Sequence, residues 1–311
     1  MDIILRIKNK IRFKKARLSN YKSSLKMSQQ YNQINQLLMN SVVRSKETKI
    51  AVVVHLFYEE SWILIEKKLK NLSIPFDLFI SIPSSNTRII NNIKKKYQLA
   101  YIYITPNKGR DVLPFVKILP IINDKGYSYV LKLHSKKSTH RVDGQEWMTN
   151  MISSLLPDKK QVLDDLLSIL EKKSTGIIGP EDQYISLIVN FQANGTLMTK
   201  TLKIIYKNRK KVFNILQKNR KNYGFFAGTM FWIRLDNFKS IINYNFKLSD
   251  FELENGQIDG TFAHALERVF CLIHEINGKK IYEISPSSIK SIGYKTTNIP
   301  DWANVQIKKI N

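Results

Sequence analysis

A short polar turn at residues 107–111 (Asn-Lys-Gly-Arg-Asp) has the residue types to bind a phosphate-bearing ligand. It follows a strand-like segment and precedes a helix-like one, so we expect it at the carboxyl edge of a parallel sheet, where open α/β sheets bind ligands. Gly109 permits a backbone turn that other residues resist, and Arg110 offers a planar set of donors suited to phosphate or carboxylate. Asp111 could face the ligand, or it could be the N-cap of the following helix.

A second polar segment, at residues 134–137 (His-Ser-Lys-Lys), ends another strand-like segment. Cations that follow a buried strand together repel one another, and a bound phosphate or diphosphate would relieve that repulsion. We therefore expect His134, Lys136 and Lys137 to lie beside Arg110 at one cationic edge of the sheet. The alternative is an ordinary solvated loop.

The only dense acidic patch of the sequence lies at residues 250–267, in a chain whose formal charge is +25. Acid–base chemistry needs a carboxylate held near the reacting oxygen, and Asp259 stands at the expected start of an apolar helix. His264 and Glu267 follow on one face of that helix, three residues apart. The alternatives are an N-cap role for Asp259 and a purely structural role for His264.

Gly228 and Thr229 interrupt an aromatic, apolar segment at residues 223–234, which we expect to be one buried strand. Small residues inside a strand indicate the close approach of a ligand or of another backbone. A packing role explains these two residues equally well.

Strand-like and helix-like segments alternate from residue 49 onward, which indicates an open, mostly parallel sheet with helices on both faces. The expected strands of this part are residues 50–54, 76–82, 101–104 and 127–133, and the helices between them are residues 58–72, 85–97 and 112–122. Further along, we expect helices at residues 144–156, 161–172, 196–222 and 261–276, and strands at 176–179, 223–234 and 280–285. We expect residues 49–311 to form a single domain.

The strong positive charge favours polyanionic partners, namely nucleic acid, anionic lipid or phosphorylated substrates. A general preference for lysine on the surface is the alternative explanation. Residues 1–28 combine many cations with aliphatic residues at helical spacing. This pattern predicts an amphipathic helix that either lies on an anionic membrane surface or docks on the rest of the protein. Residues 29–48 are typical of a linker.

Cys271 is the only cysteine, which excludes an intrachain disulfide and a cysteine-based zinc site and favours a reducing compartment. No segment has the ~18 consecutive apolar residues of a membrane span. Charged residues interrupt the apolar positions at the amino terminus, so no secretory signal is expected. The predicted location is therefore cytoplasmic and peripheral, on the inner face of the cell membrane.

Taken in order, four motifs resemble the rhamnan synthesis protein F family. They are residues 107–111, residues 132–137 followed by Gly144 and Trp147, residues 226–234 and residues 254–268, with His55 near the first strand. The resemblance implies a glycosyltransferase of bacterial cell-surface polysaccharide assembly. It also implies a nucleotide-sugar donor, such as dTDP-rhamnose or UDP-galactofuranose, and a lipid-linked or polymeric glycan acceptor.

The order of elements is also similar to that of glycosyltransferases with the GT-A fold, in which a strand ending in Asp-x-Asp holds a metal on the donor diphosphate. Here the strand ends in His134-Ser135-Lys136, and both aspartates are missing. We therefore expect cationic groups in place of a divalent metal, with Mg²⁺ or Mn²⁺ as the alternative. The residues expected to bind the nucleotide-sugar diphosphate are His55, Gly109, Arg110, Asp111, His134, Lys136, Lys137 and His264.

In this likeness Asp259 corresponds to the general base that deprotonates the acceptor hydroxyl in an inverting transfer, and Glu254 is the second candidate. The acceptor pocket is expected to include Trp147, Gly228, Thr229 and Glu267. Two other classes of protein stay open. One is a nucleic-acid-binding basic protein, although no motif supports nucleic acid as a partner. The other is a non-catalytic module that binds sugar nucleotides.

Overall fold

The computed structural model describes residues 42–44, 48–83, 87–135, 144–189, 191–206, 209–218 and 220–292. The expected amino-terminal helix lies outside the described residues, as do Lys136 and Lys137 of the expected cationic edge. Within the described part of the chain, no helix has the length and the apolar character that crossing a membrane requires.

A central sheet organises the described residues, with the strand order β10-β9-β5-β8-β4-β1-β2-β3. Its strands are β1 (Ile50–His55), β2 (Phe76–Ile82), β3 (Tyr101–Ile104), β4 (Tyr129–His134), β5 (Thr175–Pro180), β8 (Phe231–Arg234), β9 (Lys280–Ile284) and β10 (Ile289–Ile292). Strand β8 pairs antiparallel with both β4 and β5, β10 pairs antiparallel with β9, and the other pairings are parallel. This largely parallel sheet confirms the expected GT-A-like α/β fold.

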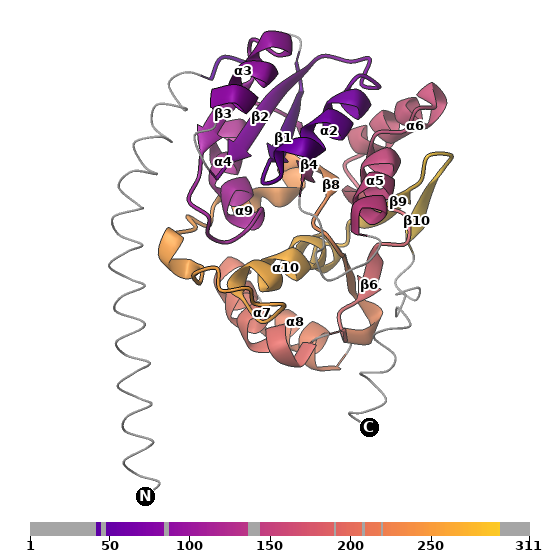
Figure 1. The fold of residues 1–311 in the computed structure, drawn as a ribbon. Coiled ribbons are helices and arrows are strands. Elements are labelled where there is room, and N and C mark those ends of the chain that lie inside the picture. The colour runs from indigo at the N-terminus through magenta and orange to yellow at the C-terminus, as the bar shows by residue number, and fades with distance from the viewer. Residues whose placement is uncertain are drawn as a thin grey trace, which may run out of the picture.

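Helices cover both faces of the sheet (Figure 1). Successive residues of a strand point to opposite faces, and β1 shows this clearly, because Val52 and Val54 belong to one apolar cluster and Ala51 and Val53 to the other. The first face carries α2 (Trp62–Leu69), α3 (Thr87–Lys96), α5 (Gly144–Leu155) and α6 (Lys160–Glu171). The second face carries α4 (Val112–Asp124), α9 (Lys239–Ile242) and α10 (Phe262–Ile276).

Helix α7 (Phe191–Ile205) packs on α10 on the side away from the sheet, and α8 (Arg209–Phe213) packs on α7. A five-residue π-helical turn, η2 (Asn214–Lys218), and a 3-10 turn, η3 (Arg220–Asn222), follow α8. The single helix expected at residues 196–222 is therefore a series of shorter helical pieces. Figure 1 places α7 and α8 at the end of the molecule opposite α2 and α3.

The expectation of one strand at residues 223–234 is wrong. Strand β7 (Gly224–Phe226) pairs with β6 (Tyr184–Ser186) in a separate two-stranded ladder, whereas β8 belongs to the central sheet. Between them, Gly228 and Thr229 have φ values of +90° and +50°. Such left-handed residues cannot continue an extended strand, and the aromatic composition of both halves concealed the break.

Candidate functional site

The charged loops meet at the carboxyl edge of the parallel strands. In the register of β1 and β4, His55 lies opposite His134, at the last position of each strand. The turn at residues 107–111 follows β3, and the turn at residues 227–230 leads into β8, whose reversed direction brings its first residue to the same edge. The described parts of these segments therefore lie at one edge of the sheet.

A buried ion pair lies directly beneath this edge. Lys132 Nζ is 2.5 Å from Asp111 Oδ2 and also donates to the carbonyl oxygen of Thr229 at 2.7 Å. The hydroxyl of Thr229 donates to the same Asp111 oxygen at 2.7 Å. The rings of Phe115 and Phe231 lie near the ammonium group, at 5.4 and 5.9 Å from their centroids.

Burial disfavours the Asp111 carboxylate, but Lys132, His134 and the hydrogen bond from Thr229 outweigh that effect and hold the pKa of Asp111 well below its usual value. The backbone of Asp111 occupies the N-cap position of α4, yet its side chain makes no capping hydrogen bond. The carboxylate is committed to Lys132 and Thr229 instead, so the alternative of a side-chain cap is wrong.

The turn at residues 107–111 requires a glycine at its centre. Gly109 and Arg110 are both left-handed, with φ of +63° and +56°. A Cβ atom on Gly109 would lie 2.6 Å from atoms of Leu113 and of Phe251, so a side chain has no room there. The adjacent Lys108 forms an antiparallel bridge with Leu253, which fastens the turn to the acidic segment.

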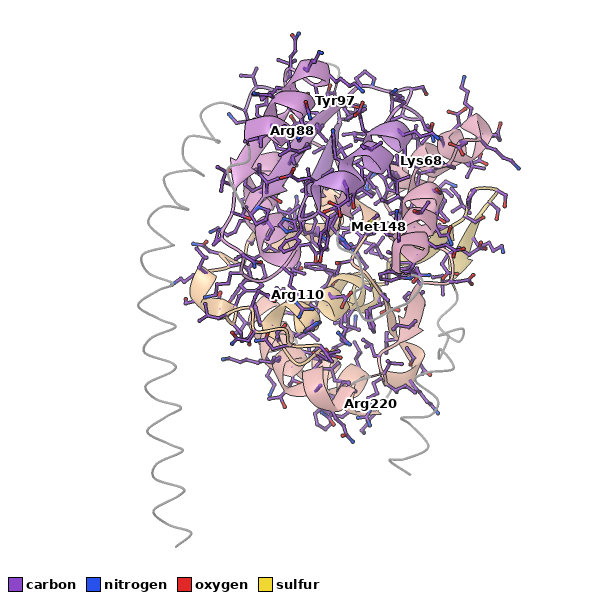
Figure 2. All side chains as sticks on the ribbon, viewed as in Figure 1. Lys68, Arg88, Tyr97, Arg110, Met148 and Arg220 are labelled. Atoms are coloured by element: carbon purple, nitrogen blue, oxygen red, sulfur yellow. The ribbon has the colours of Figure 1, made fainter. Side chains whose placement is uncertain are left out.

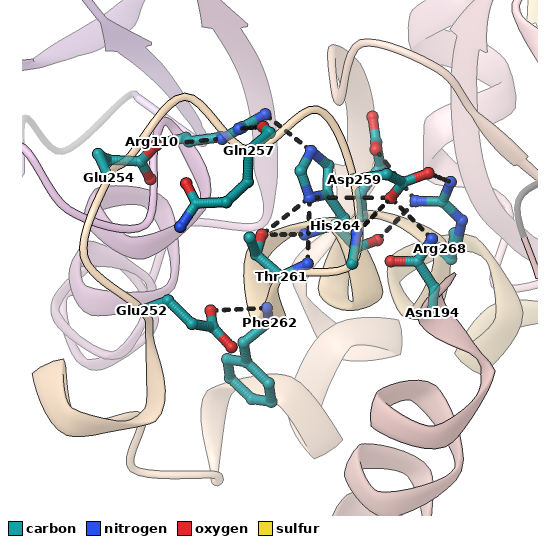
Figure 3. A network of polar contacts seen from close by, with 12 residues as sticks. Arg110, Asn194, Glu252, Glu254, Gln257, Asp259, Thr261, Phe262, His264 and Arg268 are labelled. Carbon is teal, nitrogen blue, oxygen red and sulfur yellow. Dashed lines mark hydrogen bonds and ion pairs between the residues drawn. The ribbon is translucent and has the colours of Figure 1, made fainter. Parts of the chain in front are cut away.

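Arg110 joins that acidic segment to α10 (Figure 3). Its Nε lies 3.4 Å from a carboxylate oxygen of Glu254, its Nη2 donates to the carbonyl oxygen of Gln257, and its Nη1 lies 2.7 Å from Nε2 of His264. Because a guanidinium can only donate, Nε2 of His264 accepts from Arg110. Nδ1 of His264 lies 2.8 Å from the hydroxyl of Thr261 and 3.3 Å from its backbone nitrogen, in the capping box that begins α10.

Asp259 is held by donors on three sides. Asn194 of α7 donates to Oδ1 at 2.7 Å, the backbone N–H of Gly260 donates to the same oxygen at 2.9 Å, and Arg268 lies 3.3 Å from Oδ2. The side chain of Asp259 is 16% exposed, so it is oriented and still reachable. The N-cap of α10 is Thr261, which makes the N-cap alternative for Asp259 wrong.

The turn before β8 brings the four expected pocket residues together. The backbone N–H of Gly228 donates to Glu267 Oε1 at 2.9 Å, and its carbonyl oxygen accepts from Nε2 of His134. A Cβ on Gly228 would lie 2.9 Å from the Trp147 ring, which explains the small residue. Burial, with the charges of Asp111 and Asp259, raises the pKa of Glu267, and Arg268 and the Gly228 amide oppose this.

The ligand-binding roles expected of His55 and His134 stay predictions. His55 is buried and shares a 2.8 Å hydrogen bond with the Ser81 hydroxyl, and His134 is 2% exposed. Among the residues that the structure describes, no three His, Cys, Asp or Glu side chains are grouped so as to hold a metal ion. The use of cations in place of a metal is thus still a prediction, because Lys136 and Lys137 lie outside the described residues.

Sequence reasoning did not single out three residues that complete the site. Lys132 stands inside an apolar strand and is buried. A buried cation needs a partner of opposite charge, so its position in the sequence already indicated a buried ion pair. Arg268 lies one helical turn after His264 and was visible as a neighbour on α10. Asn194 had no signal, because it reaches Asp259 from a helix 65 residues away in the chain.

A largely parallel sheet with a reversed strand beside β4, and with charged loops at its carboxyl edge, defines an α/β protein of the GT-A-like class. A family model described as rhamnan synthesis protein F matches residues 7–278, and the chain belongs to that family. The family's description links the chain to polysaccharide synthesis.

The chain is also similar to curated proteins named "uncharacterized protein WxcX" from two strains of Xanthomonas campestris pv. campestris. Each is 32% identical over 176 residues, which are 56% of this chain and 24% of the relative. The chain thus matches about a quarter of the length of these relatives.

Removing one member of the buried pair of Asp111 and Lys132 should destabilise the fold far more than removing one member of an exposed ion pair. We expect Lys132→Met to lower the free energy of unfolding by about 3–5 kcal/mol, because it leaves Asp111 charged and buried. Asp111→Asn combined with Lys132→Met should lose less than the sum of the single losses. Urea unfolding gives the free energy of unfolding of the two single variants, Lys132→Met and Asp111→Asn, and of the double variant. The matched control is Lys290→Met, which removes an ion pair to Glu181 in which the two side chains are 68% and 35% exposed, and should lower the free energy of unfolding by about 0–1 kcal/mol. Strict additivity of the two buried substitutions would contradict the pairing.

The same pair should make stability depend on acid pH. The pKa of Asp111 is depressed in the folded protein, so its contribution is fully present above the unfolded value of about 4 and is lost as the pH falls below it. The stability difference between the wild type and Asp111→Asn should therefore shrink as the pH is lowered from about 6 to about 2. Urea unfolding at a series of pH values measures it, and a pH-independent difference would show that the carboxylate is not specifically stabilised.

Proposed function

We propose that this protein is a glycosyltransferase of bacterial cell-surface polysaccharide assembly. It moves a sugar of the rhamnose or galactofuranose type from a dTDP- or UDP-linked donor to a lipid-linked or polymeric glycan. Family membership and the GT-A-like sheet support this proposal. The observation that carries it is the convergence of Arg110 with Glu254, Asp259 and His264 at the carboxyl edge, although Arg110 and His264 are 154 residues apart in the chain.

Arg110 is the described cation best placed for the donor diphosphate. His264 and the Gln257 carbonyl orient its guanidinium, and its contact with Glu254 is long, at 3.4 Å, with both side chains partly exposed. Partly exposed ion pairs contribute little, so a diphosphate can replace Glu254 at low cost and form charge-assisted hydrogen bonds with the same group.

Asp259 serves as the general base. As the acceptor oxygen forms its bond to the anomeric carbon, its proton passes to a carboxylate oxygen of Asp259, and the bond to the nucleotide diphosphate breaks on the opposite face of the sugar. Asn194 and Arg268 hold the carboxylate in one orientation. Asp111 is a weaker candidate, because it is 6% exposed and paired with Lys132. Glu254 is left as the second candidate.

Substitution of Asp259 tests this assignment. We expect Asp259→Asn to reduce sugar transfer by about 10²–10⁴-fold, because proton removal by a positioned base contributes on that order. Binding of the nucleotide donor should be retained, since the substitution spares Arg110. Initial rates with purified donor and acceptor, and calorimetric titration of the nucleotide, measure the two effects. Glu254→Gln is the matched control, and a transfer rate that falls only in that variant would reassign the base.

The missing Asp-x-Asp motif predicts that transfer does not need a divalent metal. The negative charge of the diphosphate would be balanced by Arg110 with Lys136 and Lys137. We expect the rate to persist in EDTA, and Lys136→Ala combined with Lys137→Ala to weaken nucleotide-diphosphate binding by about 10-fold or more. Complete loss of activity in EDTA that Mn²⁺ restores would contradict the metal-free mechanism and leave the transferase assignment intact.

A further inference from the structure

We propose that α7, α8 and η2 carry a surface that docks on an anionic lipid bilayer. This basic–apolar surface is defined by six exposed residues, Lys200, Lys203, Ile204, Lys210, Phe213 and Lys218. It lies at the end of the molecule where Figure 2 labels Arg220, opposite the end that carries Lys68, Arg88 and Tyr97. It is separate from the site at the carboxyl edge of the sheet.

The charge of this region is of one sign. No aspartate or glutamate occurs between Asp182 and Asp236, whereas lysine and arginine are concentrated at residues 200–221 of that stretch. Lys200, Lys203 and Lys210 project from the exposed faces of α7 and α8. Such a surface attracts an anionic partner, and repulsion among its own cations is relieved when that partner binds.

Two large apolar side chains stand among these cations. Ile204 is 50% exposed and Phe213 is 57% exposed. Other apolar residues form the buried faces of α7 and α8. Met198 and Leu202 form the face of α7 that packs on the core, and Val212 does the same for α8. Ile204 and Phe213 therefore lie outside the core of the fold.

Cations together with exposed aliphatic and aromatic groups identify the partner. A bilayer offers both anionic headgroups and an apolar interior, and interfacial helices use lysine with Phe and Leu in this way. A nucleic acid backbone would engage the lysines but gives Ile204 and Phe213 nothing apolar to enter. The bilayer is thus the partner that accounts for both kinds of side chain.

Helix α7 connects this surface to the candidate site. Its first turn carries Asn194, which donates to Asp259, and Ile204 lies ten residues further along the same helix. At 1.5 Å per residue the separation along the helix axis is about 15 Å. A bilayer on the basic–apolar surface would hold the catalytic carboxylate close to lipid-linked acceptors. This last step rests on the proposed function, whereas the docking itself does not.

The test uses the full chain and vesicles of phosphatidylcholine with about one third phosphatidylglycerol. One variant reverses four charges (K200E, K203E, K210E and K218E), and another replaces the apolar pair (I204S and F213S). In a flotation assay, we expect the charge-reversal variant to lose at least about 100-fold in affinity, because each cation near an anionic surface contributes roughly a factor of five. We expect the I204S/F213S variant to lose about 10-fold, because it has fewer apolar groups to insert into the bilayer. Hydrogen exchange of residues 200–218 should slow when vesicles are added.

Matched controls lie on the opposite end of the molecule. Reversing Lys67, Lys70, Lys159 and Lys160, and replacing the exposed Ile63 and Leu99 by serine, should change vesicle affinity by less than about twofold. Unchanged affinity of the two test variants, with unchanged exchange of residues 200–218, would assign membrane contact to other parts of the chain and overturn the proposal.

Two further outcomes are informative. If the lysine variant loses affinity for a duplex oligonucleotide while the I204S/F213S variant binds vesicles like the wild type, the surface binds nucleic acid and the proposal is wrong. Sugar transfer to a soluble acceptor separates this result from the proposed function. Transfer that persists in variants with lost vesicle binding supports a docking role, and a wild type without transfer contradicts the proposed function alone.

Discussion

The buried contact between Asp111 and Lys132 is the interaction on which the rest of the site depends. Each charge would be costly in the interior without the other, and the 2.5 Å contact, completed by both polar groups of Thr229, compensates the lost hydration. The three residues come from the turn after β3, from β4 and from the turn before β8. One polar cluster therefore sets the positions of three segments at the carboxyl edge of the sheet.

That cluster also determines how the outer loops are placed. Thr229 is held in a left-handed conformation next to Gly228. In this turn the backbone N–H of Gly228 donates to Glu267, and the carbonyl oxygen of Gly228 accepts from His134. Glu267 belongs to α10, whose neighbouring residues His264 and Arg268 hold Arg110 and Asp259. Hydrogen bonds and the ion pair between Glu267 and Arg268 thus connect the core ion pair to the partly exposed carboxylate of Asp259.

The acidic segment at residues 250–267 and helices α7 and α8 carry charges of opposite sign. In the acidic segment, Glu254 is paired with Arg110, and Asp259 and Glu267 are paired with Arg268. Helices α7 and α8 carry exposed lysines and no carboxylate. This difference matters physically, because a carboxylate that must accept a proton works best where nearby donors orient it, whereas exposed lysines attract anions at longer range.

The sequence alone determined the elements whose signals are local. The β-branched and apolar residues of β1, β2 and β3 predicted strands with bounds close to those observed, and the left-handed glycine of the turn at residues 107–111 was recognised from its neighbours. The tertiary structure alone decided the partner of Lys132, the break between β7 and β8, and the contact of Asn194 with Asp259. Backbone propensity acts over a few residues, but these contacts join positions 21 and 65 residues apart and exist only once the order of the strands and the packing of α7 on α10 are set.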